Sequence, residues 1–176
     1  MLHQFNNILP IHLSQTVLGE KSIVVSPVSL LFTLTLLKKH ISYQYKLLSC
    51  ISGVDLLGKA YRFVVVYDLL SLTFNSRLKV KAFVNEITFL PSSVGTFINA
   101  DWWEREIWDL YGIYFTNHPD LRRILTDYGF EGHPMRKDFP LSGYIELRYD
   151  ESKKRVITEA IQLTQEFRTF TLETPW

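Results

Sequence analysis

YRFVVVYDLLSLTFNSRLKVKAFVN, at Tyr61–Asn85, holds the strongest strand signal in the chain. Its first part, Tyr61–Leu70, is rich in β-branched and aromatic residues, which favour strands. Its second part, Arg77–Asn85, alternates apolar and polar residues, and one face would carry Leu78, Val80, Ala82 and Val84. Because Asn75–Ser76 is a typical turn pair, the segment predicts an antiparallel β-hairpin.

Upstream of this hairpin, the sequence predicts a strand followed by a helix. Ser22–Val25 is apolar enough for a short strand, Ser26 is a suitable helix N-cap, and Pro27 suits the first helical position. One helical face would then hold Leu30, Leu31, Leu34, Leu37 and Ile41. The apolar run Ile23–Leu37 has 15 residues, fewer than the roughly 20 that a membrane span requires, so we interpret it as part of the core. Two weaker patterns predict a short helix at Asn6–Leu18 and a strand at Tyr43–Ile51.

Downstream of the hairpin, the pattern changes to helices and turns. Pro91–Asn99 is predicted to be helical, and Asp101 is predicted to cap a second helix with Glu104 as its capping-box partner. Gly112 would end that helix. Thr116–Gly143 is rich in glycine, proline and charges and is predicted to be irregular. Two alternating runs, Tyr144–Tyr149 and Arg155–Thr164, flank the polar turn Asp150–Lys154 and predict a second hairpin.

Helices mixed with antiparallel hairpins predict an α+β fold, in which helices cover a mixed or antiparallel sheet. We expect residues 1–115 to form the globular domain. Residues 116–176 would form a long irregular C-terminal arm with its hairpin, packing on partner subunits. An irregular stretch of this length is usually functional or bound to a partner.

Composition excludes several classes of protein. The chain has 176 residues with 19 Lys and Arg against 18 Asp and Glu, so it has no general basic field that would indicate nucleic-acid binding. Residues 1–100 nevertheless carry a net charge of +5 and residues 101–176 a net charge of −4. One cysteine, Cys50, cannot form an internal disulfide, a zinc ribbon or an iron–sulfur cluster. The first 20 residues contain no Lys or Arg, so we expect neither an import presequence nor a secretory signal.

The segment DWWEREIWDLYG, residues 101–112, contains three of the four tryptophans. A helix here would have an apolar stripe of Trp103, Ile107, Leu110 and Tyr111. Its other side would form the i,i+4 ion pairs Asp101–Arg105 and Arg105–Asp109. Trp102 and Trp108 lie among these charges, and large aromatics beside Arg and Glu are typical of a buried protein interface.

Residues 101–144 offer three kinds of chemical site to consider. A metal could be held by His and carboxylate ligands, namely His118, Asp120, Asp127, His133 and Asp138, but no metal-binding spacing is present. Arg122–Arg123 or Arg136–Lys137 could bind phosphate, although no glycine-rich loop leads into a helix there. Glu104 and Glu106 form a poor acid–base pair, because residues i and i+2 point to different faces of a helix. We therefore predict no catalytic, cofactor-binding or metal-binding residue in this chain.

Trp102–Asp150, WWEREIWDLYGIYFTNHPDLRRILTDYGFEGHPMRKDFPLSGYIELRYD, resembles the diagnostic block of a known family. This is the 30 kDa hydrophilic subunit of NADH:ubiquinone oxidoreductase, respiratory complex I, in its mitochondrial and proteobacterial style. The positions that match the family signature are Glu104, Arg105, Glu106, Asp109, His118 and Arg122. Tyr61–Val84 and Arg155–Phe170 share the resemblance.

The resemblance implies a peripheral-arm scaffold subunit that supports electron transfer from NADH to ubiquinone coupled to proton translocation. FMN and the iron–sulfur clusters would be carried by partner subunits. The chief partners would be the 49 kDa-type quinone-cavity subunit and neighbouring cluster-bearing chains, and this chain would have no transmembrane segment of its own. It would lie on the matrix side of the mitochondrial inner membrane, or on the cytoplasmic face of a bacterial membrane. The alternatives are the same subunit type in a plastid-type dehydrogenase or a membrane-bound hydrogenase, and a stand-alone metal-dependent enzyme.

Structural or partner-interface roles are predicted for two groups of residues. The first would brace the junction between helix and arm, and contains Trp102, Trp103, Glu104, Arg105 and Glu106. The second would form inter-subunit or arm-fixing ion pairs, and contains Arg122, Arg123, Arg136, Lys137 and Asp138. Asp109 and His118 complete the predicted set.

Overall fold

The computed structural model describes residues 10–17, 19–168 and 170, and it divides into two compact units. The first unit ends at Phe139 and the second begins at Pro140. The sequence predicted a boundary at residue 116. The loop 116–139 belongs to the first unit because, as described below, side chains of that unit bind its backbone and its charges.

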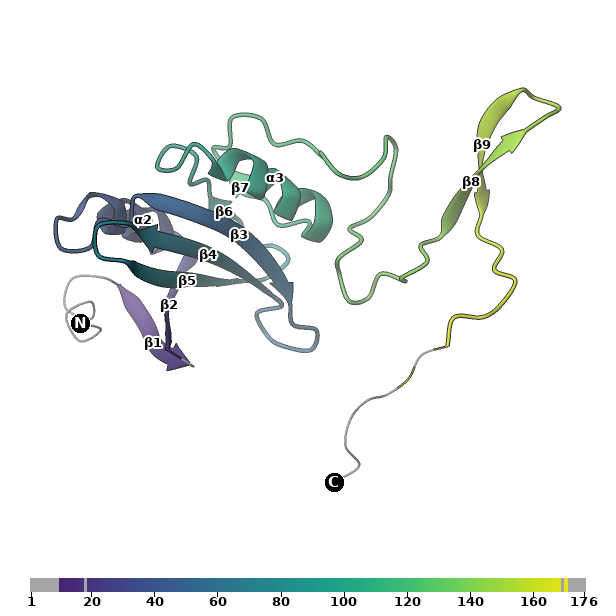
Figure 1. The fold of residues 1–176 in the computed structure, drawn as a ribbon. Coiled ribbons are helices and arrows are strands. Elements are labelled where there is room, and N and C mark those ends of the chain that lie inside the picture. Colours follow the sequence, from purple (N-terminus) through teal and green to yellow (C-terminus); the bar gives the residue numbers. More distant parts are fainter. Residues whose placement is uncertain (1–9, 18, 169, 171–176) are drawn as a thin grey trace. The chain divides into compact units, whose positions relative to one another are not determined.

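A five-stranded mixed sheet forms the first unit, with the strand order β1-β2-β5-β4-β3 (Figure 1). Its strands are β1 (Ile11–Val17), β2 (Glu20–Val25), β3 (Leu47–Asp55), β4 (Phe63–Ser71) and β5 (Ser76–Val84). All neighbours are antiparallel except β2 and β5, which are parallel. The hairpin predicted from Tyr61–Asn85 is β4–β5, in register from the Phe63–Val84 pair to the Ser71–Ser76 pair. Asn75, with φ of 43°, supplies the left-handed backbone of its turn.

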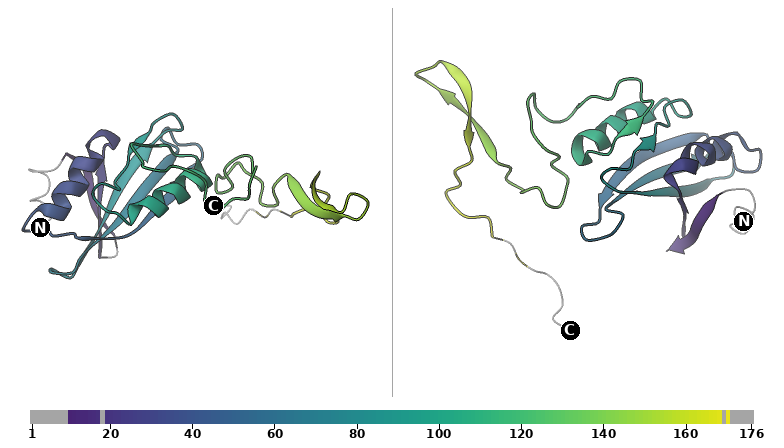
Figure 2. Two further views of the ribbon diagram at one scale, coloured as in Figure 1. Left: turned by 90° about the horizontal axis from the view of Figure 1, so that it is seen from above. Right: turned by 180° about the vertical axis from the view of Figure 1, so that it is seen from behind.

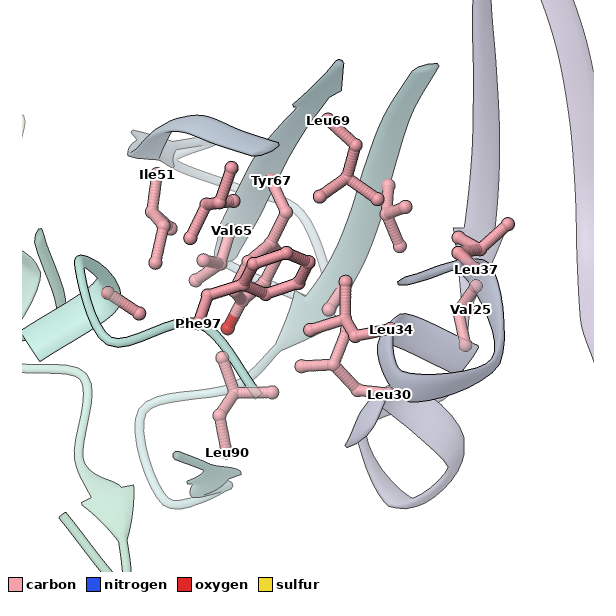
Figure 3. Packing of buried hydrophobic residues seen from close by; sticks show 14 of the residues in the cluster. Val25, Leu30, Leu34, Leu37, Ile51, Val65, Tyr67, Leu69, Leu90 and Phe97 are labelled. Carbon is pink, nitrogen blue, oxygen red and sulfur yellow. The ribbon is translucent and has the colours of Figure 1, made fainter. Parts of the chain in front are cut away.

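Two helices cover one face of this sheet. Alternate residues of β4 and β5, Val65, Tyr67 and Leu69 on one strand and Leu78, Val80 and Ala82 on the other, are buried in a single cluster. Helix α2 (Leu30–Lys39), preceded by the 3-10 turn η1 (Pro27–Ser29), adds Leu30, Leu34 and Leu37 to the cluster (Figure 3). Helix α3 (Ala100–Tyr111) adds Ala100 and Ile107. The predicted α+β fold with a helix-covered sheet is therefore confirmed.

A short parallel pair, β6 (Leu90–Pro91) with β7 (Phe115–Thr116), brackets α3 in the sequence and joins the segments before and after it (Figure 1). The two views in Figure 2 show the green helix α3 beside the sheet. Helix α3 itself begins after Asn99 and ends at Gly112, whose φ of 77° is the left-handed conformation predicted for a helix-ending glycine. The predicted capping box is wrong. Asn99, not Asp101, is the N-cap, and the Glu104 side chain turns away from it to bind Ser92 and Ser93.

The second unit contains the predicted C-terminal hairpin. Strand β8 (Ile145–Asp150) pairs antiparallel with β9 (Arg155–Ala160). Asp150 shapes the turn, since its Oδ1 accepts hydrogen bonds from the N–H groups of Ser152 and Lys153. Arg148 and Glu159 form an exposed cross-strand ion pair.

Three local predictions differ from the structure. Residues 11–17 of the predicted helix Asn6–Leu18 form the edge strand β1, because pairing with β2 overrides a weak helical pattern, and residues 6–9 and 18 lie outside the described part. The strand predicted from Tyr43 begins only at Leu47, since the left-handed Gln44 (φ 46°) interrupts it. Pro91–Asn99 forms β6 and turns, not a helix.

The apolar face predicted for the first helix is only partly correct. Leu30, Leu34 and Leu37 are buried as expected, whereas Leu31 is partly exposed. Ile41 lies beyond the end of α2 at Lys39 and is largely exposed. The helix is thus shorter than its apolar pattern.

Gly53 provides a test of how closely α3 packs on β3. A Cβ atom at this position would lie 2.7 Å from Cε2 of Tyr111, a distance that forces the ring or the strand to move. We expect Gly53→Ala to lower the free energy of unfolding by about 1–3 kcal/mol, as overpacking of a filled interior does. Urea unfolding of the full chain measures it. Gly95→Ala, where the added Cβ meets open space, is the matched control, and an equal loss at both positions would contradict this packing.

Candidate functional site

Helix α3 buries its charges and exposes an aromatic side chain, the reverse of an ordinary amphipathic helix. The residues Glu104 and Asp109 are 0% exposed and Arg105 is 7% exposed, whereas Trp102 is 65% exposed. Buried ionisable groups are rare unless each is hydrogen-bonded or paired. The partners of these three side chains therefore define the candidate site.

Asp109 binds the backbone of the loop 116–139. Its Oδ2 accepts hydrogen bonds from three consecutive N–H groups, those of Ile124 (3.3 Å), Leu125 (2.8 Å) and Thr126 (2.9 Å). Its Oδ1 accepts the Thr126 hydroxyl at 2.7 Å and lies 3.4 Å from Nη1 of Arg123. Burial alone would raise the pKa of Asp109, but these hydrogen bonds outweigh it and lower the pKa. Asp109 is thus an anion held in a nest of loop amides.

Glu104 binds the segment that follows β6. Its Oε1 accepts the Ser93 N–H (2.7 Å) and the Ser93 hydroxyl (2.6 Å), and its Oε2 accepts the Ser92 hydroxyl (2.7 Å). The side chain of His118 is fully buried, and its Nε2 lies 3.8 Å from Oε2 and 3.3 Å from Oδ1 of Asp101. Burial raises the pKa of Glu104, although the serine hydrogen bonds oppose this effect.

Arg105 does not form the predicted i,i+4 ion pairs. Its guanidinium stacks on the Trp102 ring, 5.2 Å from the ring centre, and its Nε donates to the carbonyl oxygen of Arg122. Within the described residues, no ion pair joins it to Asp101 or Asp109. The reason is that backbone and hydroxyl donors of the loop already occupy the Asp109 carboxylate.

The end of α3 is tied to residues 133–136. His133 Nδ1 lies 2.9 Å from the Asp109 carbonyl oxygen, and Arg136 Nε donates to the Tyr111 carbonyl oxygen at 2.7 Å. Both satisfy carbonyl groups that a helix leaves without intrahelical partners at its C-terminus. Gly112 leaves room for them, since a Cβ there would lie 2.5 Å from Nε2 of His133. Burial lowers the pKa of His133.

Arg62 joins the sheet to the end of the loop. It donates two hydrogen bonds to the buried carboxylate of Asp55 (2.9 and 3.0 Å) and pairs with Glu86 (2.5 Å) and Asp138 (2.8 Å). The N–H of Lys137 adds a further bond to Asp55 at 2.8 Å. The side-chain hydrogen bond from Arg62 is the main cause of the lowered pKa of Asp55.

The structure groups some predicted site residues and separates others. Five of them bind a partner across the contact between α3 and the loop, namely Arg105, Asp109, His118, Arg123 and Arg136. Glu104 binds Ser92 and Ser93 after β6 instead. Asp138 binds Arg62, and Lys137 is held by its backbone, not by its exposed side chain. Arg122 pairs with the exposed Asp120. Among the described residues Glu106 forms no ion pair, and Trp103 packs against the hydrophobic core.

Four important partners were missed by the sequence reasoning: Arg62, Asp55, Ser92 and Ser93. No local pattern indicates them, because each meets its partner only after the sheet and α3 have packed. Thr126 could have been found as a hydroxyl residue in a charged turn.

The alternative sites considered from the sequence are not assembled. Among the residues that the structure describes, no group of three or more His, Cys, Asp and Glu side chains could hold a metal ion. The five candidate ligands are instead dispersed: His118 lies beside Asp101, His133 beside the backbone of Asp109, and Asp138 beside Arg62. Arg122–Arg123 and Arg136–Lys137 are engaged with carboxylates and carbonyl groups, not gathered around an open anion site.

Comparisons with known proteins identify relatives of this chain. A sequence model of the family described as "Respiratory-chain NADH dehydrogenase, 30 Kd subunit" matches residues 23–145. The chain is 57% identical over 158 residues to NADH-ubiquinone oxidoreductase subunit 9 of Reclinomonas americana, covering 90% of this chain and 78% of that protein. It is 52% identical over 158 residues to an NADH-quinone oxidoreductase subunit of Paramagnetospirillum magneticum, covering 90% of this chain and 79% of that protein.

Among solved structures, a chain of the membrane-bound sulfane sulfur reductase, an archaeal respiratory membrane complex, is similar with a TM-score of 0.67. The match covers 80% of this chain and 84% of that chain at 21% identity. At this level of identity the likeness shows a shared fold.

Asp109→Asn tests whether the carboxylate holds the loop. Because the folded-state pKa is lowered, the stabilisation from Asp109 is present above its unfolded pKa and is lost as the pH falls through the lower folded value. We expect the substitution to cost about 1.5–3 kcal/mol at neutral pH, the range for hydrogen bonds to charged groups. The cost should shrink in acid. Urea unfolding across pH measures both, with the exposed Asp127→Asn as control, and a cost independent of pH would argue against the charged nest.

Arg62→Met tests the tie between sheet and loop, since methionine keeps much of the apolar stem but no charge. The buried Asp55 carboxylate would then retain only the Lys137 N–H, and we expect a loss of about 3 kcal/mol. Arg148→Met, which breaks the exposed pair with Glu159, should cost less than about 1 kcal/mol. Adding Asp55→Asn to Arg62→Met should recover part of the loss, and the absence of any recovery would show that the carboxylate is not the cause.

Proposed function

Since the chain belongs to the 30 kDa subunit family of the respiratory-chain NADH dehydrogenase, we propose that it is a peripheral-arm scaffold subunit of NADH:ubiquinone oxidoreductase. The complex passes electrons from NADH to ubiquinone and couples this to proton translocation. The role of this chain is positional: it fixes the quinone-cavity subunit and the neighbouring chains, and it contributes no catalytic residue of its own.

The observation that carries this proposal is that the buried carboxylates of α3 are bonded to groups of this chain itself. Glu104 and Asp109, which in an enzyme would be candidates for acid–base chemistry, are fully buried and bonded to backbone and serine groups of this chain. Their arrangement stiffens the domain and the loop 116–139. A rigid body with no open catalytic centre among its described residues is suited to holding other subunits in place.

The second unit supplies a surface for such partners. The β8–β9 hairpin exposes four large apolar side chains, and its register places them on one face: Ile145, Leu147, Tyr149 and Val156. An isolated two-stranded hairpin is only marginally stable in water. This apolar face therefore supports the predicted role of the C-terminal arm, which is to pack on partner subunits.

The partners we propose are the 49 kDa-type quinone-cavity subunit and neighbouring cluster-bearing chains. FMN and the iron–sulfur clusters belong to those partners, in keeping with the single cysteine of this chain. Interface or bracing roles remain proposed for Trp102, Trp103, Glu104, Arg105, Glu106, Asp109, His118, Arg122, Arg123, Arg136, Lys137 and Asp138. The largely exposed Trp102, with Arg105 stacked on it, is the strongest candidate for direct contact.

For location, we propose the matrix side of the mitochondrial inner membrane, with attachment through partner subunits. The relatives include both NADH-ubiquinone oxidoreductase and bacterial NADH-quinone oxidoreductase subunits, so the corresponding bacterial site would be the cytoplasmic face of the membrane. Within the described residues, the structure has no helix with the length and apolarity of a membrane span.

Purification of the native assembly tests this function. If the chain is tagged in its own cells, flavin, several iron–sulfur clusters and NADH:ubiquinone reductase activity should co-purify with it. Recovery with a hydrogenase or a plastid-type dehydrogenase instead would favour the second candidate, the same subunit type in another complex. Recovery of the chain alone, with tightly bound metal, would overturn the proposal.

Arg136→Ala should impair assembly before it alters turnover. Arg136 binds the Tyr111 carbonyl oxygen and its guanidinium lies 5.2 Å from the centre of the Phe63 ring, so its loss loosens the end of the loop. We expect a severalfold lower fraction of the chain in the intact complex on native gels, with an unchanged rate per assembled complex. Arg77→Ala, at an exposed arginine on β5, is the control. Normal assembly with a selectively lost quinone reductase rate would exclude the scaffold role for Arg136.

A further inference from the structure

Glu104 is a fully buried carboxyl group, and the imidazole Nε2 of His118 lies 3.8 Å from its Oε2. Within the described residues, no Lys or Arg side chain forms an ion pair with it, and the neighbouring Arg105 is committed to Trp102 and to the Arg122 carbonyl oxygen. A buried carboxylate in such surroundings is disfavoured relative to its neutral form. Three hydrogen bonds from Ser92 and Ser93 offset part of that cost. The site therefore tolerates an ionised Glu104 through hydrogen bonds, without a Lys or Arg side chain paired with it.

The hydrogen-bonding groups around Glu104 also fit the protonated acid. When Glu104 is ionised, the Ser92 hydroxyl donates to Oε2. When Oε2 carries a proton, it can donate to Ser92 Oγ instead, since a hydroxyl both donates and accepts. Ser92 Oγ already accepts the Val94 N–H at 3.3 Å and has capacity for a second donor. Glu104 Oε2 and Ser92 Oγ can therefore remain hydrogen-bonded to each other in either state.

Asp109, five residues along the same helix, shows the contrast. Its oxygens accept three loop N–H groups and lie beside the Arg123 guanidinium, which can only donate, and they accept one hydroxyl, that of Thr126. Two of the three donors to Glu104 are instead hydroxyls, which can also accept. That set fits the ionised form, and the pKa of Asp109 is lowered while burial raises the pKa of Glu104. When two environments shift the pKa values of two carboxyl groups in opposite directions, one group stays an anion and the other can exchange a proton.

We propose that Glu104, with Ser92 and Ser93, is a proton-binding site inside the domain. The ligand is a single proton, held between Oε2 and the Ser92 hydroxyl oxygen. The site differs from the proposed scaffold role, and it requires no partner subunit.

The titratable groups that face this site come from three elements. Helix α3 contributes Asp101, whose Oδ1 is 3.3 Å from His118 Nε2, and β4 contributes the fully buried Tyr67, whose pKa is raised first by burial and then by the charge of Glu104. The segment after β7 contributes His118. The Ser92–Ser93 segment contributes no ionisable side chain.

His118 connects the site to the loop. Its Nδ1 accepts the Asp120 N–H at 3.1 Å, so the ring carries its proton on Nε2 in the neutral form. The Nε2 atom lies 3.2 Å from the Asp101 carbonyl oxygen and 3.3 Å from Asp101 Oδ1, with Glu104 Oε2 farther away at 3.8 Å. An ionised Glu104 attracts the Nε2–H, whereas a protonated Glu104 leaves it to Asp101. Proton uptake at Glu104 thus shifts the ring and, through Nδ1, the amide of Asp120 at the start of the loop 116–139.

NMR titration of the full chain, labelled with carbon-13 at the glutamate side-chain carboxyl carbons, tests the site. We expect the Glu104 carboxyl carbon to titrate at higher pH than the exposed glutamates, and the Asp120 amide to show a step with the same midpoint. In Glu104→Gln, which mimics the filled site, that step should vanish. Asp109→Asn should leave the Glu104 midpoint close to its wild-type value.

Two further measurements keep the test decisive if Glu104→Gln folds poorly. Ser93→Ala removes a donor that favours the ionised carboxylate. In this variant the titration midpoint of Glu104 should therefore lie at a higher pH than in the wild type. In addition, because the folded-state pKa is raised, stability from Glu104 is present at low pH and is lost as the pH rises through the folded value. A Glu104 that titrates together with the exposed glutamates, or a midpoint that Ser93→Ala lowers or leaves unmoved, would overturn the proposal.

Discussion

The bond between the Asp109 carboxylate and three successive amides of the loop 116–139 is the interaction on which the rest of the first unit depends. Apart from the two-residue strand β7, this loop has no regular secondary structure, so few of its backbone groups find partners in a ladder. Asp109 satisfies the amides of Ile124, Leu125 and Thr126 from the body of the domain. In return, the loop supplies the donors that make a fully buried anion tolerable.

Arginine side chains extend this arrangement along the loop. Arg123 lies beside Asp109, and Arg62 gathers Asp55, Glu86 and Asp138 at the far end. Arg62 and Arg136 each also lie over the Phe63 ring, at 5.1 and 5.2 Å from its centre. Since planar guanidinium groups both stack and donate in a fixed fork, they can join a strand, a helix end and a loop at once.

The sequence predicted those parts of the fold that depend on local periodicity. The β4–β5 hairpin and the β8–β9 hairpin alternate clearly and pair as expected, and Gly112 ends α3 as its conformational freedom predicts. Strand β1 was not predicted because the sequence pattern of this segment is ambiguous between helix and strand. The segment becomes a strand by pairing with β2. The polar side of α3 was expected to lie at an interface or in solvent, because its burial depends on Ser92, Ser93 and the loop amides, and none of these contacts follows from spacing within the helix.

The two units stabilise themselves by different means, and this difference bears on how a scaffold subunit works. The first unit satisfies its buried charges internally, so its order does not require another chain. The second unit is a two-stranded ribbon that exposes Ile145, Leu147, Tyr149 and Val156. Burying that face elsewhere would stabilise the ribbon, so its order and the binding of a partner are thermodynamically linked. Substitutions of the buried charges in the first unit should therefore act on assembly through the folding of the loop, whereas those on the apolar face of the hairpin should act on assembly directly.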